Sequence, residues 1–81
     1  MGKVERHELW MRLANRPNSV RLEELDQLLR LFGWELHNVR GSHHHYRRGA
    51  ARLSIPLHRP TLKAVYVRRA LAVMQEQIDD A

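Results

Sequence analysis

The chain is 81 residues long, contains no cysteine and carries a formal net charge of +5, from 14 Lys and Arg against 9 Asp and Glu. This length predicts one domain with a small core and excludes a deep substrate cavity, and the lack of cysteine excludes disulfides, a thiolate nucleophile and cysteine-ligated zinc. No signal-peptide pattern and no apolar run of membrane-spanning length is visible, so we expect a cytoplasmic protein that does not enter a membrane.

Two helices are predicted in the first part of the chain. An apolar stripe that includes Trp10 and Leu13 predicts a helix over residues 4–14, which a polar turn containing proline follows. Leucines at helical spacing predict a second helix over residues 22–32, and Gly33 is the expected stop.

Three short strands are expected next. Alternating apolar and polar residues predict strands over residues 34–39, 43–47 and 52–57, with turns at Arg40-Gly41 and Gly49-Ala50. Short turns of this kind join antiparallel strands, so the pattern predicts a sheet of consecutive hairpins.

A last helix is predicted over residues 63–78, with an apolar stripe that contains Val67, Leu71 and Met74. The order of elements predicts a single two-layer α+β domain, in which the helices cover one face of a three-stranded antiparallel sheet. The other face is then open. Residues 1–17 are expected to form an N-terminal helical extension and residues 18–78 the core of the domain.

The basic residues are unevenly distributed along the chain. No Asp or Glu occurs from Leu36 to Gln75, a span that holds five of the six histidines, and 12 of the 14 basic residues of the chain are arginine. Arginine binds phosphate in a bidentate manner and stacks on bases, and a one-sided positive field attracts polyanions. We therefore favour nucleic-acid binding over a basic surface that serves solubility alone. The basic residues of this span are Arg40, Arg47, Arg48, Arg52, Arg59, Lys63, Arg68 and Arg69.

The run from Gly41 to His45, which reads Gly-Ser-His-His-His, has several interpretations. An engineered tag is set aside because such tags lie at chain ends and contain more histidines. A metal site is a second interpretation. Adjacent strand residues point to opposite faces, so His43 and His45 could share an ion, together with His37 or His58. Few carboxylates lie nearby, which excludes an acidic two-metal centre and leaves structural zinc as a weak alternative.

Acid–base chemistry on RNA is the third interpretation of the histidine run. Imidazole titrates near neutral pH, so it can accept a proton from a 2′-hydroxyl or donate one to a leaving oxygen. RNA supplies its own nucleophile, and the surrounding arginines can stabilise the extra charge of the transition state. Spacing alone does not distinguish this chemistry from polar strand residues with no catalytic role.

Five segments of the chain form a recognisable pattern: Val20-Arg21-Leu22-x-x-Leu25-x-x-Leu28-Leu29, Phe32-Gly33-Trp34-Glu35-Leu36, Gly41-Ser42-His43-His44 with Tyr46, Leu53-x-Ile55-Pro56-x-His58 and Val67-Arg68-x-x-Leu71. With these segments the sequence resembles the HicA toxins of bacterial and archaeal toxin–antitoxin systems. The resemblance covers roughly residues 18–78, and the glycine–serine–histidine element after the first strand is its most specific part.

The resemblance implies a fold like that of the double-stranded-RNA-binding domain and a ribonuclease that cleaves messenger RNA. It also implies inhibition by a HicB-like antitoxin. The histidine that follows Gly-Ser is the catalytic residue of the family, which corresponds to His43, with Gly41, Ser42 and His44 as supporting residues. Three segments depart from the family pattern: the helix before Pro17, which many members lack, the short turn Arg48-Gly49-Ala50-Ala51 and the start of the last helix, Lys63-Ala64-Val65-Tyr66.

We therefore predict a toxin that is a metal-independent endoribonuclease, with messenger RNA and an antitoxin protein as partners and no cofactor. Trp34 is expected in the core, and Tyr46 is either a core residue or a residue that stacks on a base. A non-catalytic RNA- or DNA-binding module is the main alternative, and a protein whose charge serves only to bind an acidic partner is a weaker one. The predicted RNA-binding residues are Arg40, Tyr46, Arg47, Arg48, Arg52, Lys63, Arg68 and Arg69.

Overall fold

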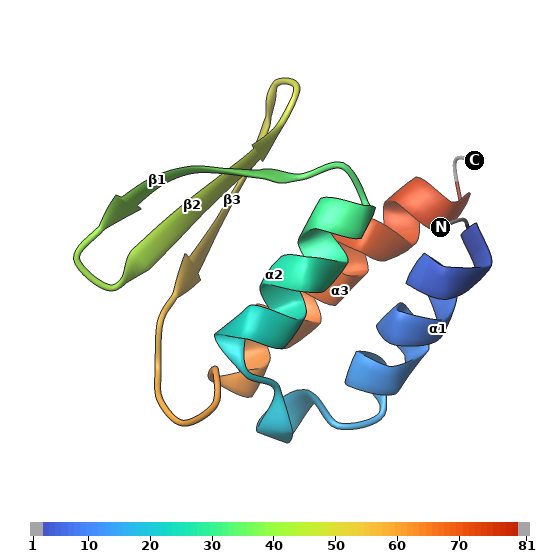
Figure 1. Ribbon diagram of the computed structural model, residues 1–81, viewed down its shortest axis with the longest axis horizontal. Coiled ribbons are helices and arrows are strands. Elements are labelled where there is room, and N and C mark those ends of the chain that lie inside the picture. The colour runs from blue at the N-terminus through green and yellow to red at the C-terminus, as the bar shows by residue number, and fades with distance from the viewer. Residues whose placement is uncertain (1–2, 80–81) are drawn as a thin grey trace.

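The computed structural model of the chain describes residues 3–79, and its elements follow the predicted order. The elements are α1 (Lys3–Ala14), a short 3₁₀ helix η1 (Pro17–Ser19), α2 (Leu22–Leu31), β1 (Glu35–Arg40), β2 (His43–Arg48), β3 (Ala51–Pro56) and α3 (Ala64–Asp79). The predicted α+β class is confirmed, because the sheet is antiparallel with strand order β1-β2-β3 and the helices lie together beside one of its faces (Figure 1).

Both hairpin turns are two residues long and begin with glycine. Arg40 pairs with His43 across the first turn, and Arg48 pairs with Ala51 across the second. Gly41 and Gly49 have φ values of 57° and 58°, which is the conformation that tight hairpin turns demand and that residues with a Cβ rarely adopt. These turns therefore set the register of β2 against both of its neighbours.

Strand β1 contains an irregularity that changes which of its residues share a face. Leu36 pairs with Tyr46 but Asn38 pairs with His45, so the register shifts by one residue at a bulge between them. An extra residue in one strand reverses the alternation beyond it. As a result Leu36 and Val39, which are three positions apart, lie on the same face of the sheet.

The core lies between the helix-facing side of the sheet and the helices. The predicted core positions Trp34, Val67, Leu71 and Met74 are buried, as expected. The buried cluster consists of Leu13, Val20, Leu22, Leu25, Leu28, Leu29, Phe32, Trp34, Tyr46, Leu53, Ile55, Leu62, Val67, Ala70, Leu71 and Met74.

Helix α1 packs on the other two helices. Leu13 is fully buried, the indole Nε1 of Trp10 donates a hydrogen bond of 3.0 Å to the carbonyl oxygen of Leu71, and the Arg6 guanidinium lies 4.7 Å from the centroid of the Phe32 ring. These contacts give the first helix a structural role in the domain.

The edge strand β1 extends beyond the helices. All six of its residues are exposed, and the side chains of Leu36 and Val39 are 36% and 47% exposed although they face the helix side. The alternation of Trp34 and Leu36 with polar residues predicts a half-buried first strand, and this prediction is wrong. The apolar side chains of β1 are less well covered than Leu53 and Ile55 of β3, which are buried.

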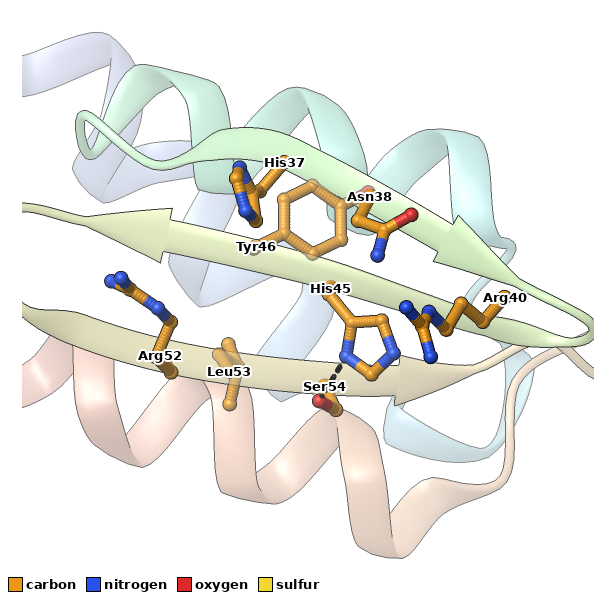
Figure 2. A pocket seen from close by; sticks show the side chains of 8 residues that line it. All are labelled: His37, Asn38, Arg40, His45, Tyr46, Arg52, Leu53 and Ser54. Atoms are coloured by element: carbon orange, nitrogen blue, oxygen red, sulfur yellow. Dashed lines mark hydrogen bonds between the residues drawn. The ribbon is translucent and has the colours of Figure 1, made fainter.

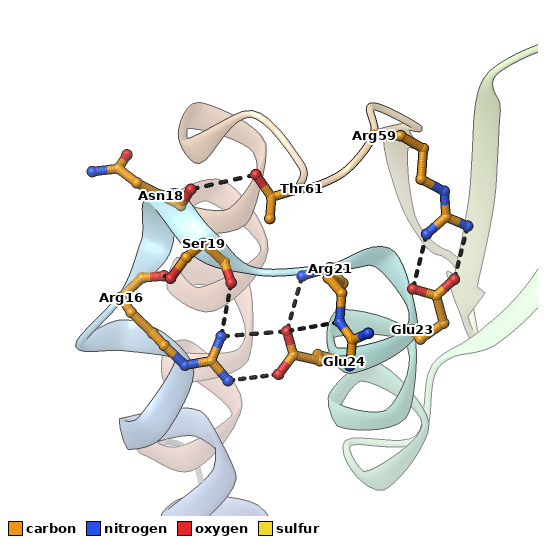
Figure 3. Close-up of polar contacts among 8 residues, drawn as sticks. All are labelled: Arg16, Asn18, Ser19, Arg21, Glu23, Glu24, Arg59 and Thr61. Atoms are coloured by element: carbon orange, nitrogen blue, oxygen red, sulfur yellow. Dashed lines mark hydrogen bonds and ion pairs between the residues drawn. The ribbon is translucent and has the colours of Figure 1, made fainter.

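Ion pairs join the start of α2 to the segments before η1 and after β3 (Figure 3). Arg16 donates to Glu24 at 2.6 Å, and this hydrogen bond lowers the pKa of Glu24. Arg59 donates to both carboxylate oxygens of Glu23, at 3.0 and 2.7 Å, and lowers the pKa of Glu23 to about 2. Arg59 therefore already binds a carboxylate, from a residue outside the Leu36–Gln75 span that lacks Asp and Glu.

Candidate functional site

The open face of the sheet gathers basic and imidazole side chains from all three strands. Residues paired across antiparallel strands share a face, and alternate residues of one strand share a face. Tyr46 is buried against the helices, so its neighbours in β2 point the opposite way. The residues that face away from the helices include Glu35 and Arg40 from β1, His43, His45 and Arg47 from β2, and Arg52 and Ser54 from β3. Figure 2 shows four of them, Arg40, His45, Arg52 and Ser54.

A shallow depression of about 370 Å³ lies on this open face (Figure 2). All three strands contribute to it, through side chains such as His37, Arg40, Arg52 and Ser54. No Asp or Glu is among the residues that line it. The depression is therefore a surface suited to an anionic ligand of extended shape.

Two histidines of β2 lie side by side on the open face. The ring centroids of His43 and His45 are 6.2 Å apart, and their planes differ by 13°. His43 is exposed, while His45 is half-buried with its Nδ1 atom 2.7 Å from the hydroxyl oxygen of Ser54. The sequence alone does not predict on which face of the sheet His43 lies, and the structure places it on the face away from the helices.

His44 points the other way, toward the helices. It pairs with Val39 and with Ile55, and Ile55 is fully buried. Its Nδ1 atom is buried and has no hydrogen-bond partner within residues 3–79. A supporting role for His44 would therefore have to act through the sheet rather than from the surface that carries His43.

Tyr46 is a core residue, so its prediction as a base-stacking or RNA-binding residue is wrong. The side chain is 1% exposed, and its hydroxyl donates a hydrogen bond of 2.6 Å to Asp26 Oδ1 of α2. Asp26 also accepts a bond of 2.8 Å from Arg30 Nε. Burial, followed by the bond to Asp26, raises the pKa of Tyr46. A ring in this position has no face left for a nucleobase.

The arginines predicted to bind RNA fall into separate groups. Arg47 lies between two register partners on the open face, Arg52 of β3 and Glu35 of β1, so it faces a like charge on one side and a carboxylate on the other. Arg52 is steadied by hydrogen bonds from Nη1 to the carbonyl oxygens of Gly49 and Ala51, at 3.0 and 3.2 Å. Arg48 lies on the opposite face, where its side chain approaches Gly33.

The basic residues at the start of α3 are remote from the depression. Arg68 lines a groove between α1 and α3 together with Trp10. The Arg69 guanidinium lies 5.5 Å from the centroid of the Tyr66 ring, and Lys63 is exposed just before the helix begins. The structure therefore brings Arg40, Arg47 and Arg52 together with the histidines and leaves these three cations apart.

Residues 3–79 contain no group of three histidine, aspartate or glutamate side chains placed to hold a metal ion. In the same part of the chain, no helix combines the length and the apolar character needed to cross a membrane.

Comparison with protein families matches residues 22–75 to the model described as the HicA toxin of bacterial toxin–antitoxin systems. The chain belongs to the HicA toxin family. This match extends from the start of α2 into α3 and so includes the whole sheet with its open face. Corresponding comparisons with curated proteins and with solved structures found no match.

Two polar residues at the HicA-like site were not singled out from the sequence as part of a proton-transfer site. His45 was named as a possible metal ligand and belongs to the run interpreted as an acid–base site, but it was given no catalytic role of its own, although the two-residue period of a strand already places it beside His43. Ser54 had no local signal, because its contact with His45 depends on the register of β3 against β2.

Proposed function

We propose that this HicA toxin is an endoribonuclease that cleaves messenger RNA, that His43 is a catalytic residue, and that the reaction requires no metal ion. A HicB-like antitoxin is the proposed inhibitor. The observation that carries the proposal is the position of His43 on the open sheet face beside Arg40, next to a depression that no Asp or Glu lines.

The chemistry follows from the side chains on that face. An RNA strand over the depression would offer its 2′-hydroxyl as the nucleophile, and the exposed imidazole of His43 could transfer a proton to or from a reacting oxygen. Arginine guanidiniums would bind the phosphate and stabilise the charge that develops on it. The absence of acidic side chains around the depression disfavours Mg²⁺, which prefers carboxylate ligands.

The same basic face supports the proposed pairing with an antitoxin. The domain has a net charge of +5, and a partner that covers the open face with acidic side chains would both neutralise Arg40, Arg47 and Arg52 and block access to His43. Inhibition would then result from occlusion of the RNA surface.

The test is incubation of the purified protein with a long RNA, with and without EDTA, beside His43→Ala prepared in the same way. We expect wild-type cleavage to persist in EDTA and to be lost in the variant. Loss of cleavage in EDTA that a divalent ion restores would contradict the metal-independent mechanism. Persistent cleavage by His43→Ala would point to another residue or to a contaminant and would favour a non-catalytic RNA-binding module.

A further inference from the structure

The open face carries a second imidazole that the function proposed above does not use. His45 is two residues from His43 in β2, and their rings are nearly parallel with centroids 6.2 Å apart. Side chains at this spacing project in the same direction from a strand, so both rings border the surface over which an RNA strand would lie. One phosphodiester linkage is small enough to lie within reach of both.

The two imidazoles differ in how they are held. His45 is half-buried and lines the depression, and its Nδ1 is fixed by Ser54 at 2.7 Å (Figure 2). His43 is exposed and makes no side-chain hydrogen bond within residues 3–79. The Nε2 atom of His45 likewise has no hydrogen-bond partner in that range, so this atom is available to a ligand.

Ser54 allows either protonation state of the His45 ring. A serine hydroxyl can donate to a bare Nδ1, which leaves the proton on Nε2, or accept from a protonated Nδ1. The ring orientation is the same in both cases. His45 can therefore present Nε2 as a proton donor or as a proton acceptor without moving, which is the property that acid–base catalysis requires.

We propose that His45 is a second catalytic residue and that His43 and His45 act as an acid–base pair on one RNA phosphate. One imidazole takes the proton of the 2′-hydroxyl as the 2′-oxygen forms its bond to phosphorus. The other gives a proton to the 5′-oxygen as the P–O5′ bond breaks. The products are a 2′,3′-cyclic phosphate and a 5′-hydroxyl, and no other reactant is consumed. This inference rests on the proposed ribonuclease function.

Neighbouring groups fit this arrangement. Arg40 pairs in register with His43 and also lines the depression beside His45. A guanidinium in that position can bind the non-bridging oxygens of a phosphate that both imidazoles reach. Asn38, the register partner of His45 on β1, offers a neutral hydrogen-bonding group and adds no charge that would compete with the phosphate.

The experiment compares His45→Ala with His7→Ala, which removes an exposed histidine on α1. One linkage that the wild type cuts in a long RNA is mapped. A short RNA containing it is then made in two forms, one native and one with sulfur in place of the bridging 5′-oxygen. A thiolate leaves without protonation, so the sulfur substrate restores cleavage when the proton donor is missing and not when the acceptor is missing.

We expect His45→Ala to cleave the native RNA at least about 100-fold more slowly than the wild type, while His7→Ala is unchanged. We expect the sulfur substrate to rescue one of the two variants, His43→Ala or His45→Ala, and not the other. His45→Gln, which keeps an amide near Ser54 but cannot titrate, should behave as His45→Ala and guards against a folding defect.

Two results would overturn the inference. If His45→Ala cleaves the native RNA at the rate of His7→Ala, His45 transfers no proton. If the sulfur substrate rescues His43→Ala and His45→Ala equally, or rescues neither, His45 only positions the RNA. In either case the ribonuclease function stands if His43→Ala is inactive. If the wild type does not cleave RNA, both proposals fail together.

Discussion

The two faces of strand β2 differ in how their polar side chains are held, although both faces carry histidine and arginine. On the helix side, the Tyr46 hydroxyl is held by Asp26 and the Arg48 side chain lies against Gly33. On the open side, the imidazole of His43 is exposed and so is Arg47, whose register partners are Glu35 of β1 and Arg52 of β3. The comparison teaches that the polar side chains on one face contribute to folding, while those on the other are available to a ligand.

Among substitutions that distinguish the two faces, we expect the largest effect on the cleavage rate from a change at His43. His43→Ala should reduce the cleavage rate on the order of 10²–10⁴-fold, because a positioned acid or base contributes that much. RNA binding rests on several phosphate contacts, so the dissociation constant should change little. Single-turnover cleavage and equilibrium binding on the same RNA measure the two effects. A matching loss of affinity would mean that His43 acts in binding rather than in chemistry.

The salt dependence of RNA affinity tests the arginines of the open face. Each phosphate contact to a single strand contributes about −0.7 to the slope of log K against log salt, so three to six contacts predict a slope of about −2 to −4. Affinity should then fall roughly 15- to 250-fold between 50 and 200 mM salt. A flat response would mean that this face does not bind a polyanion.

Arg47 and Arg48 form a matched pair for the same measurement, since they are adjacent in β2 but lie on opposite faces. Arg47→Ala should make the slope shallower by about 0.7, which is the contribution of one phosphate contact. Arg48→Ala should change it less, because its side chain approaches Gly33 on the helix side.

The helix side should respond in stability rather than in activity. Tyr46→Phe removes the bond to Asp26 and should lower the free energy of unfolding by about 1–2 kcal/mol, with cleavage unchanged per folded molecule. Urea denaturation measures this loss. Tyr66→Phe is the control, since the Tyr66 hydroxyl makes no hydrogen bond within residues 3–79.

The pKa of Tyr46 is raised in the folded state, so this residue stabilises the fold at neutral pH and loses that contribution as the pH rises. Wild-type stability should therefore decline above about pH 10, the ordinary pKa of tyrosine, more steeply than that of Tyr46→Phe. Equal alkaline profiles would mean that the pKa of Tyr46 is not raised in the folded state, either by burial or by the bond to Asp26.

Most of the fold could be predicted because its determinants are local. Helical leucine spacing, the stop at Gly33 and the glycines of the two hairpin turns are read from short stretches of sequence, and the elements begin and end within one or two residues of their expected positions. The exposure of Leu36 could not be predicted, because it depends on how the helices pack against the edge strand, which no local pattern reveals.

The candidate site was predicted less completely because it depends on register. The open-face arginines could be named from the charge pattern and His43 from the resemblance to HicA toxins, but the face they share is set by pairing across the turn that begins at Gly41. The burial of Tyr46 depends on Asp26, 20 residues away in the sequence, and no local pattern reveals that contact.

The most direct test of the contrast between the two faces is the cleavage rate of His43→Ala against that of His44→Ala, measured on one RNA and per folded molecule. The variants delete adjacent histidines that point to opposite sides of β2. We predict that His43→Ala loses cleavage, while His44→Ala retains more activity. The reverse ranking, with His44 essential and His43 dispensable, would contradict the assignment of the chemistry to the open face.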